Sequence, residues 1–120
     1  MYATVIRFAV PASTNWEELR QLQVRRAHET FRISGLRSRA FVFSPERGEF
    51  GANYVWETQD DAEAFLRSDQ FRTFVERFGQ PCLLEGAEIC AYVEDGDVVF
   101  PPDEMQRTLG PDAATPPPGP

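Results

Sequence analysis

Residues 51–58 have the sequence GANYVWET, in which small and aromatic side chains alternate with mostly polar ones. Alternation places Ala52, Tyr54 and Trp56 on one face of a β-strand, because successive side chains of a strand point to opposite faces. Thr58 and Asp61 follow at the spacing of a capping box, which marks the start of a helix. The stretch therefore predicts a strand over residues 50–57 that leads directly into a helix.

The segments before this strand predict two further strands and a helix. Residues 2–10 are almost entirely apolar, which indicates a central strand buried on both sides. A second capping box begins at Thr14, so we expect a helix from there to about residue 34. Residues 36–44 are rich in β-forming side chains, and turn residues separate them from the strand over residues 50–57. These two strands are expected to form a hairpin.

The segments after Thr58 complete the pattern. The apolar periodicity breaks at residues 68–69, which predicts two short helices or one kinked helix. A fourth strand is expected over residues 85–94, and a short extra strand over residues 98–100 follows a tight-turn signal at Asp95-Gly96.

Proline content changes abruptly near the C-terminus, where seven of the ten prolines follow residue 100. Such a segment cannot bury enough apolar surface to offset the entropy cost of ordering it. We therefore expect one domain over residues 1–100 and a disordered proline-rich tail over residues 101–120.

The order of elements, β-α-β-β-α-β, predicts an α+β fold, a ferredoxin-like sandwich with an antiparallel sheet and both helices on one face. The uncovered face is expected to carry Phe, Tyr and Trp side chains, and the chain has no element left to cover it. A second copy could cover it by packing sheet against sheet, so we expect a homodimer.

Composition excludes several classes of function. The net charge is -7 and the pI is near 4.7, so nucleic acid and anionic membrane surfaces are not expected partners. No apolar run approaches the roughly 20 residues of a membrane span, and no signal peptide is recognisable, so we expect a cytoplasmic protein. Cys82 and Cys90 would lie too far apart on one strand for a disulfide and are expected to be structural thiols. With a single histidine, His28, no metal site is expected.

The sequence contains no Gly-rich phosphate loop, nucleophile elbow or zinc-protease motif. His28 is either a general base or a partly exposed residue at the edge of the first helix. Tyr54 and Trp56 either flank a flat aromatic ligand or fill the core. Arg39, between aromatic residues of the 36–44 strand, either anchors an enolate or carboxylate or covers a ring at the surface. Arg7 needs a partner on its buried strand, and Glu57 and Glu88 are the candidates.

Three short motifs stand out: IRFAV at residues 6–10, GLxxRxF at residues 35–41, and GAxYxWET at residues 51–58, followed by an acidic and apolar helix. They resemble motifs of the YdhR-like mono-oxygenases, which belong with the antibiotic biosynthesis monooxygenases of the dimeric α+β barrel group. The resemblance covers roughly residues 2–94. It implies a homodimer with a pocket between sheet and helices in each subunit.

The resemblance also implies a chemistry. Better-known relatives oxidise anthrones or hydroquinones with O₂, without metal or flavin, and so we expect no cofactor. Haem-degrading relatives need an Asn on the first strand, which is absent from residues 2–10.

These features together predict a cofactor-independent monooxygenase for an aromatic polyketide, anthrone or quinol-like substrate. A cyclase or isomerase of the same fold and a non-catalytic binding dimer are the alternatives. The candidate catalytic residues are Trp56, Tyr54, Arg39 and His28. The candidate substrate-binding residues are Phe41, Phe43, Ala52, Asn53 and Phe8.

Overall fold

A computed structural model describes residues 1–29 and 32–102 of the chain. Its elements are β1 (Tyr2–Ala9), α1 (Trp16–Glu29), β2 (Leu36–Ser44), β3 (Glu49–Trp56), α2 (Gln59–Leu66), α3 (Asp69–Phe78), β4 (Leu83–Glu88), β5 (Tyr92–Glu94) and β6 (Asp97–Phe100). The chain divides into two compact units, 1–88 and 89–120. The predicted domain over residues 1–100 stays a prediction, although the structure divides the chain earlier, after Glu88. The tail predicted over residues 101–120 also stays a prediction, since residues 103–120 lie outside the described residues.

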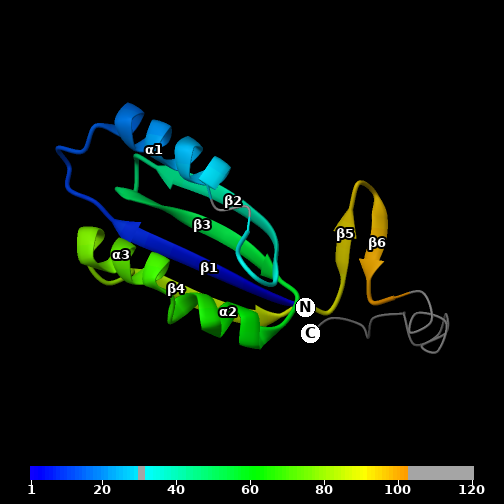
Figure 1. Ribbon diagram of the computed structural model, residues 1–120. Coiled ribbons are helices and arrows are strands. Elements are labelled where there is room, and N and C mark those ends of the chain that lie inside the picture. Colours follow the sequence, from blue (N-terminus) through cyan, green and yellow to red (C-terminus); the bar gives the residue numbers. More distant parts are fainter. Residues whose placement is uncertain (30–31, 103–120) are drawn as a thin grey trace, which may run out of the picture. The chain divides into compact units, whose positions relative to one another are not determined.

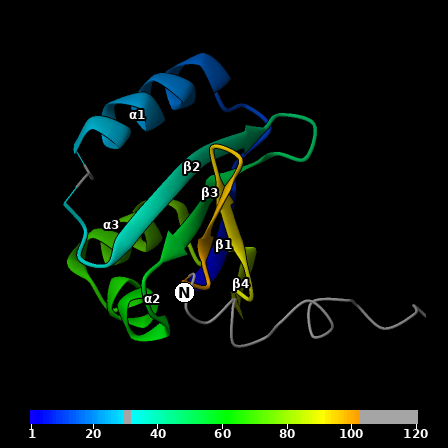
Figure 2. The same ribbon diagram turned by 90° about the vertical axis from the view of Figure 1, so that its right-hand side faces the viewer.

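The first unit has the predicted ferredoxin-like α+β architecture. Strands β1 to β4 form one antiparallel sheet in the order β2-β3-β1-β4, with the hairpin β2–β3 at one side (Figure 1). The three helices lie on the same side of this sheet (Figure 2). Helix α1 contacts β2, while α2 contacts β1 and β3.

Helix starts follow side-chain capping, although one predicted cap is wrong. Asn15, not Thr14, caps α1, because the Asn15 Oδ1 accepts from the Glu18 N–H at 3.1 Å. The Thr14 hydroxyl instead donates to the Pro11 carbonyl at 2.6 Å. The cap at Thr58 is confirmed, since its hydroxyl accepts from the Asp61 N–H at 3.1 Å.

The interruption at residues 68–69 separates two helices, α2 and α3. The Ser68 hydroxyl accepts from the Phe71 N–H at 3.2 Å and so caps α3. Helix α1 ends at Glu29, earlier than the predicted residue 34, and residues 30–31 lie outside the described residues.

The prediction of one fourth strand over residues 85–94 is wrong. Strand β4 ends at Glu88, and residues 92–94 form β5 of a separate two-stranded sheet with β6. Asp95 and Gly96 both have positive φ, 51° and 83°, which suits a tight hairpin turn and draws residues 92–94 into that hairpin. The extra strand predicted over residues 98–100 is confirmed as part of β6.

The aromatic face of the sheet is the helix-covered face, which corrects the expectation that Phe, Tyr and Trp side chains would lie on the open one. Buried residues alternate along β1 and β3, because one set of side chains packs under the helices and the other does not. The core consists of Ile6, Phe8, Leu19, Phe50, Ala52, Tyr54, Trp56, Ala62, Phe65 and Phe74. Strand β1 is therefore central in the sheet but fully buried only on its helix side.

The open face carries small aliphatic side chains together with polar ones, among them Arg7, Asn53, Glu49 and Glu85. Register places Val5 opposite Asn53, and Ala3 opposite Val55. The Arg7 guanidinium donates to Asn53 Oδ1 at 2.8 Å and to the Ala52 carbonyl at 3.2 Å. The predicted acidic partners of Arg7 are therefore wrong, since an amide and backbone carbonyls accept from it instead.

The two cysteines, Cys82 and Cys90, are free thiols, as predicted, but both are exposed, so neither packs in the core. Burial by the sheet does not reach them, because Cys82 precedes the edge strand β4 and Cys90 follows it.

Candidate active site

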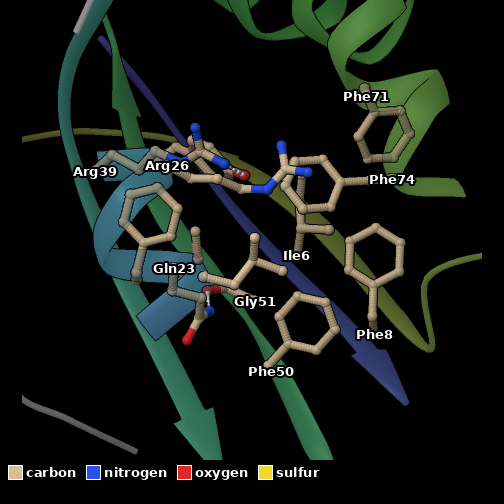
Figure 3. A pocket seen from close by; sticks show the side chains of 13 residues that line it. Ile6, Phe8, Gln23, Arg26, Arg39, Phe50, Gly51, Phe71 and Phe74 are labelled. Carbon is tan, nitrogen blue, oxygen red and sulfur yellow. Dashed lines mark hydrogen bonds between the residues drawn. The ribbon is translucent and has the colours of Figure 1, made fainter. Parts of the chain in front are cut away.

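A small cavity lies between the sheet and helices α1 and α3, with a volume of about 20 Å³. We call it the arginine cavity. Its lining residues are Ile6, Phe8, Leu22, Gln23, Arg26, Arg39, Phe41, Phe50, Gly51, Ala52, Tyr54, Phe71 and Phe74. Figure 3 shows Arg39 on one side of the cavity and the rings of Phe8, Phe71 and Phe74 on the other. The wall is thus aromatic and aliphatic, with two guanidinium groups in it.

Arg39 reaches the cavity from β2, where it pairs with Tyr54 of β3. Its guanidinium carbon lies 4.3 Å from the ring centroid of Phe41 and 4.8 Å from that of Tyr54, so it is held between two rings. The Nη2 donates to the Tyr54 hydroxyl at 3.0 Å. The Nε and Nη1 are buried and have no hydrogen-bond partner in the described part of the chain.

Arg26 reaches the same cavity from α1. Its guanidinium carbon lies 4.3 Å from the Phe74 ring centroid, and its Nε is also buried without a partner among the described residues. Buried N–H donors without acceptors are uncommon in folded proteins, because each loses its hydrogen bonds to water. The three unpaired donors of Arg26 and Arg39 therefore mark a place where an acceptor belongs.

Electrostatics at the cavity favours an anion. Burial lowers the pKa of Arg39, and the nearby charge of Arg26 lowers it further, against the opposing effect of Tyr54. Burial likewise lowers the pKa of Arg26, and the charge of Arg77 lowers it further, while the charge of Glu29, outside the cavity lining, opposes the shift. No Asp or Glu is among the described residues that line the cavity. Since an arginine stays protonated at any ordinary pH, two positive charges face the cavity without a lining carboxylate.

Tyr54 is the third polar group at this site. Burial raises the pKa of its phenol, and the adjacent Arg39 opposes that rise. The Tyr54 side chain is therefore neutral near pH 7. Its oxygen accepts from Arg39, which leaves the O–H as a donor for a ligand oxygen.

Gln23 is buried in the cavity wall, but its amide is satisfied. The Nε2 donates to the backbone carbonyls of Val42 and Gly51 at 3.1 and 3.2 Å. These bonds tie α1 to β2 and β3. Gly51 permits a close approach of the strands, because a Cβ at this position would overlap the Ile6 carbonyl.

Trp56 lies in the packed core and does not line the arginine cavity. Its side chain is 0% exposed, its indole N–H donates to the Thr4 hydroxyl at 2.9 Å, and its ring stacks on Tyr54 with centroids 5.6 Å apart. We call Trp56, Thr4, Tyr54 and Phe65 the Trp56 cluster. In the described structure Trp56 thus fills space beside the cavity.

The structure brings together five predicted site residues and separates four. Arg39, Tyr54, Phe41, Ala52 and Phe8 line the arginine cavity. The four outside it are Trp56 and three others: His28 is exposed on α1, Asn53 is on the open sheet face, and Phe43 is 40% exposed and stacks on Trp16. Asn53 does not line the cavity because strand alternation places it on the other face of the sheet from Ala52 and Tyr54.

Arg26 lines the cavity, but the sequence patterns did not indicate it as a candidate site residue. It follows Gln23 by three positions, so both point from the same side of α1, and Gln23 itself falls on the apolar stripe of the helix. The only hint in the sequence is that two polar residues, Gln23 and Arg26, lie three positions apart along an apolar stripe. This pattern alone does not show whether an arginine lines a cavity or is exposed, as Arg25 is.

The fold is that of the antibiotic biosynthesis monooxygenases. A provisionally named antibiotic biosynthesis monooxygenase from Deinococcus radiodurans superposes with a TM-score of 0.57 at 16% identity, covering 78% of this chain and 97% of that one. A similarly named protein from Chloroflexus aurantiacus gives 0.56 at 9% identity, covering 78% and 96%. SnoaB from Streptomyces nogalater, a cofactor-independent oxygenase, gives 0.54 at 17% identity, covering 80% and 97%. At these identities the likeness establishes the fold, and the YdhR-like subtype stays a prediction.

The sequence itself matches no known family profile and no curated protein. Of the helices in the described residues, none combines the length and the hydropathy that a membrane-spanning segment requires. No group of three or more His, Cys, Asp or Glu side chains that could hold a metal occurs within residues 1–29 and 32–102.

Proposed function

We propose that this chain is a cofactor-independent monooxygenase for an ionisable aromatic substrate. The observation that carries the proposal is the arginine cavity, in which three buried guanidinium donors without partners face an aromatic wall. A substrate that becomes an enolate or phenolate would supply the missing acceptor. The shared fold with SnoaB, itself a cofactor-independent oxygenase, supports the same chemistry.

In the proposed reaction the deprotonated substrate is the electron donor to O₂. For an anthrone, the ring CH₂ loses two hydrogens and gains one oxygen, and the second oxygen atom leaves as water, giving the quinone. Arg39 would stabilise the enolate oxygen through its free Nε or Nη1, and the Tyr54 O–H would donate to the same oxygen. Phe41 and Phe8 would hold the rings and exclude water from the oxygenated carbon.

Substrate binding would have to widen the cavity. About 20 Å³ accommodates roughly one water molecule, whereas sites for ligands of this kind usually exceed about 300 Å³. Arg26 is a long, partly buried side chain that lies over Phe74 and lines the cavity from α1, so a change of its rotamer would add to the space for a ligand. We therefore expect ligand binding to change the packing of Arg26 on Phe74.

Oxygen uptake with a hydroxylated anthrone tests the proposal. The expected result is equimolar consumption of O₂ and formation of the quinone, unaffected by EDTA and strongly reduced in Arg39→Met. Absence of uptake, together with a cyclised or isomerised product, would instead favour a cyclase or isomerase. Binding without any product would favour a non-catalytic binding protein.

We further propose that the protein acts as a homodimer that pairs the open faces of two sheets. The open face has small aliphatic side chains at Ala3, Val55 and Ala87, which suit close sheet packing, while Glu85 lies beside Val5 at the edge strand β4. Arg7 and Asn53 would lie within that interface. Light scattering at micromolar concentration should give twice the monomer mass of 13.6 kDa, and a monomer would contradict the proposal.

A further inference from the structure

The arginine cavity contains more positive charge than a single enolate can neutralise. Arg26 comes from α1 and Arg39 from β2, so two independent elements each direct a guanidinium into the same space. An enolate or phenolate carries one negative charge and forms only when the substrate is deprotonated. One of the two arginines would remain unpaired in the complex, and both would be unpaired before deprotonation.

We propose that the substrate is an aromatic carboxylic acid whose carboxylate is held jointly by Arg26 and Arg39. This inference rests on the proposed function in taking the arginine cavity as the substrate site. A carboxylate has two oxygens with about four acceptor positions, so it can accept from the Arg26 Nε and from one of the two unpaired Arg39 nitrogens, which leaves the other Arg39 nitrogen for the enolate oxygen. It is ionised before any chemistry takes place, so it would neutralise the cavity in the ground state.

The lining specifies the rest of the ligand. The guanidinium of Arg39 lies over the rings of Phe41 and Tyr54, and that of Arg26 lies over the ring of Phe74. The N–H groups at the edges of both guanidiniums are therefore next to aromatic rings. A ligand that follows these surfaces would place its rings against the phenylalanines and its acidic group between the guanidiniums. Among the described lining residues no carboxylate competes for the arginines.

The test compares two probes that differ in charge and hardly in shape, anthraquinone-2-carboxylate and anthraquinone-2-carboxamide. Calorimetric titration of the wild-type protein should show at least tenfold tighter binding of the carboxylate. Equal affinities, or tighter binding of the amide, would overturn the inference without the need for any variant.

Variants then assign the preference to the arginines. Arg26→Gln should reduce the preference to threefold or less, while Arg26→Lys, which keeps the charge, should retain part of it. Arg25→Gln is the matched control, because Arg25 is exposed on the same helix, and it should keep the full preference. Full preference in a folded Arg26→Gln protein, verified by an unchanged thermal midpoint, would contradict the role of Arg26.

Failure of this inference differs from failure of the proposed function. Oxygen uptake with a neutral anthrone, without any carboxylate preference, would overturn the inference and leave the monooxygenase. A carboxylate preference without oxygen uptake by any anthrone would leave the inference and overturn the monooxygenase.

Discussion

The Trp56 cluster and the arginine cavity occupy the same layer between sheet and helices, but they differ in whether their buried donors have hydrogen-bond partners. In the Trp56 cluster the indole N–H donates to the Thr4 hydroxyl, and the rings are in contact on all sides. In the arginine cavity, Arg26 and Arg39 keep buried donors without partners. Burying a polar group without a hydrogen bond lowers the stability of the fold, so unpaired donors are not expected where a side chain has only a structural role. We therefore treat the Trp56 cluster as structural and the arginine cavity as the candidate site.

The largest effect is expected when the Trp56 cluster loses its central ring. Trp56→Ala should lower the free energy of unfolding by about 3–5 kcal/mol, because a large cavity would replace a fully buried side chain. Trp56→Phe should cost about 1–3 kcal/mol, with activity per folded molecule near normal. Urea denaturation measures both. A tenfold loss of turnover in Trp56→Phe with little loss of stability would show that Trp56 belongs to the site after all.

A smaller loss is expected when the tryptophan loses its acceptor. Thr4→Val has nearly the same shape but leaves the indole N–H of Trp56 buried and unpaired, which should cost about 1–3 kcal/mol. Thr4→Ser keeps the hydroxyl and should cost less. Equal losses in the two variants, measured by urea denaturation, would mean that the Trp56 hydrogen bond contributes little.

In the arginine cavity, by contrast, removing a polar side chain is not expected to lower the free energy of unfolding. Arg39→Met removes buried donors that have no partners and keeps apolar contact with Phe41, so the free energy of unfolding should stay constant or rise by about 1–2 kcal/mol. Oxygen uptake should fall at least tenfold in the same variant. A loss of more than about 2 kcal/mol in urea denaturation would place Arg39 among the structural residues.

The smallest effect is expected at Tyr54, which belongs to both regions. Tyr54→Phe removes one hydroxyl and almost no volume but leaves the Arg39 Nη2 without its acceptor, so the free energy of unfolding should fall by about 1 kcal/mol. If the Tyr54 O–H donates to the substrate, turnover per folded molecule should also fall. Unchanged turnover, with normal binding of the anthrone, would restrict Tyr54 to its role in packing.

Local patterns of the sequence were enough to predict most of the sheet and its helices. The alternation in residues 51–58 placed Ala52, Tyr54 and Trp56 on one face correctly, because strand geometry fixes that relation. The same alternation could not say which face the helices cover. The aromatic rings were therefore assigned to the open face, although they form the helix-covered core.

The candidate site was harder to predict because it depends on contacts between distant elements. The sequence indicated Arg39 through its aromatic neighbours. It did not indicate Arg26, which becomes a candidate only because the fold brings it from α1 to the same cavity as Arg39. Trp56 was assigned to a ligand by its type and strand, and only Thr4, 52 residues away in the sequence, shows that its polar atom is already satisfied. Competing caps explain the smaller error at Thr14, where Asn15 is equally suited.

The buried amide of Gln23 also determines which motions this protein can use. Its two hydrogen bonds fasten the middle of α1 to the backbone of two strands, so sliding or rolling the helix would break both at once inside a dry interior. Arg26 begins one turn further along the same helix, beyond that fastening. Access to the cavity would therefore proceed by rotation of the Arg26 side chain about its own bonds, while the helix stays in place.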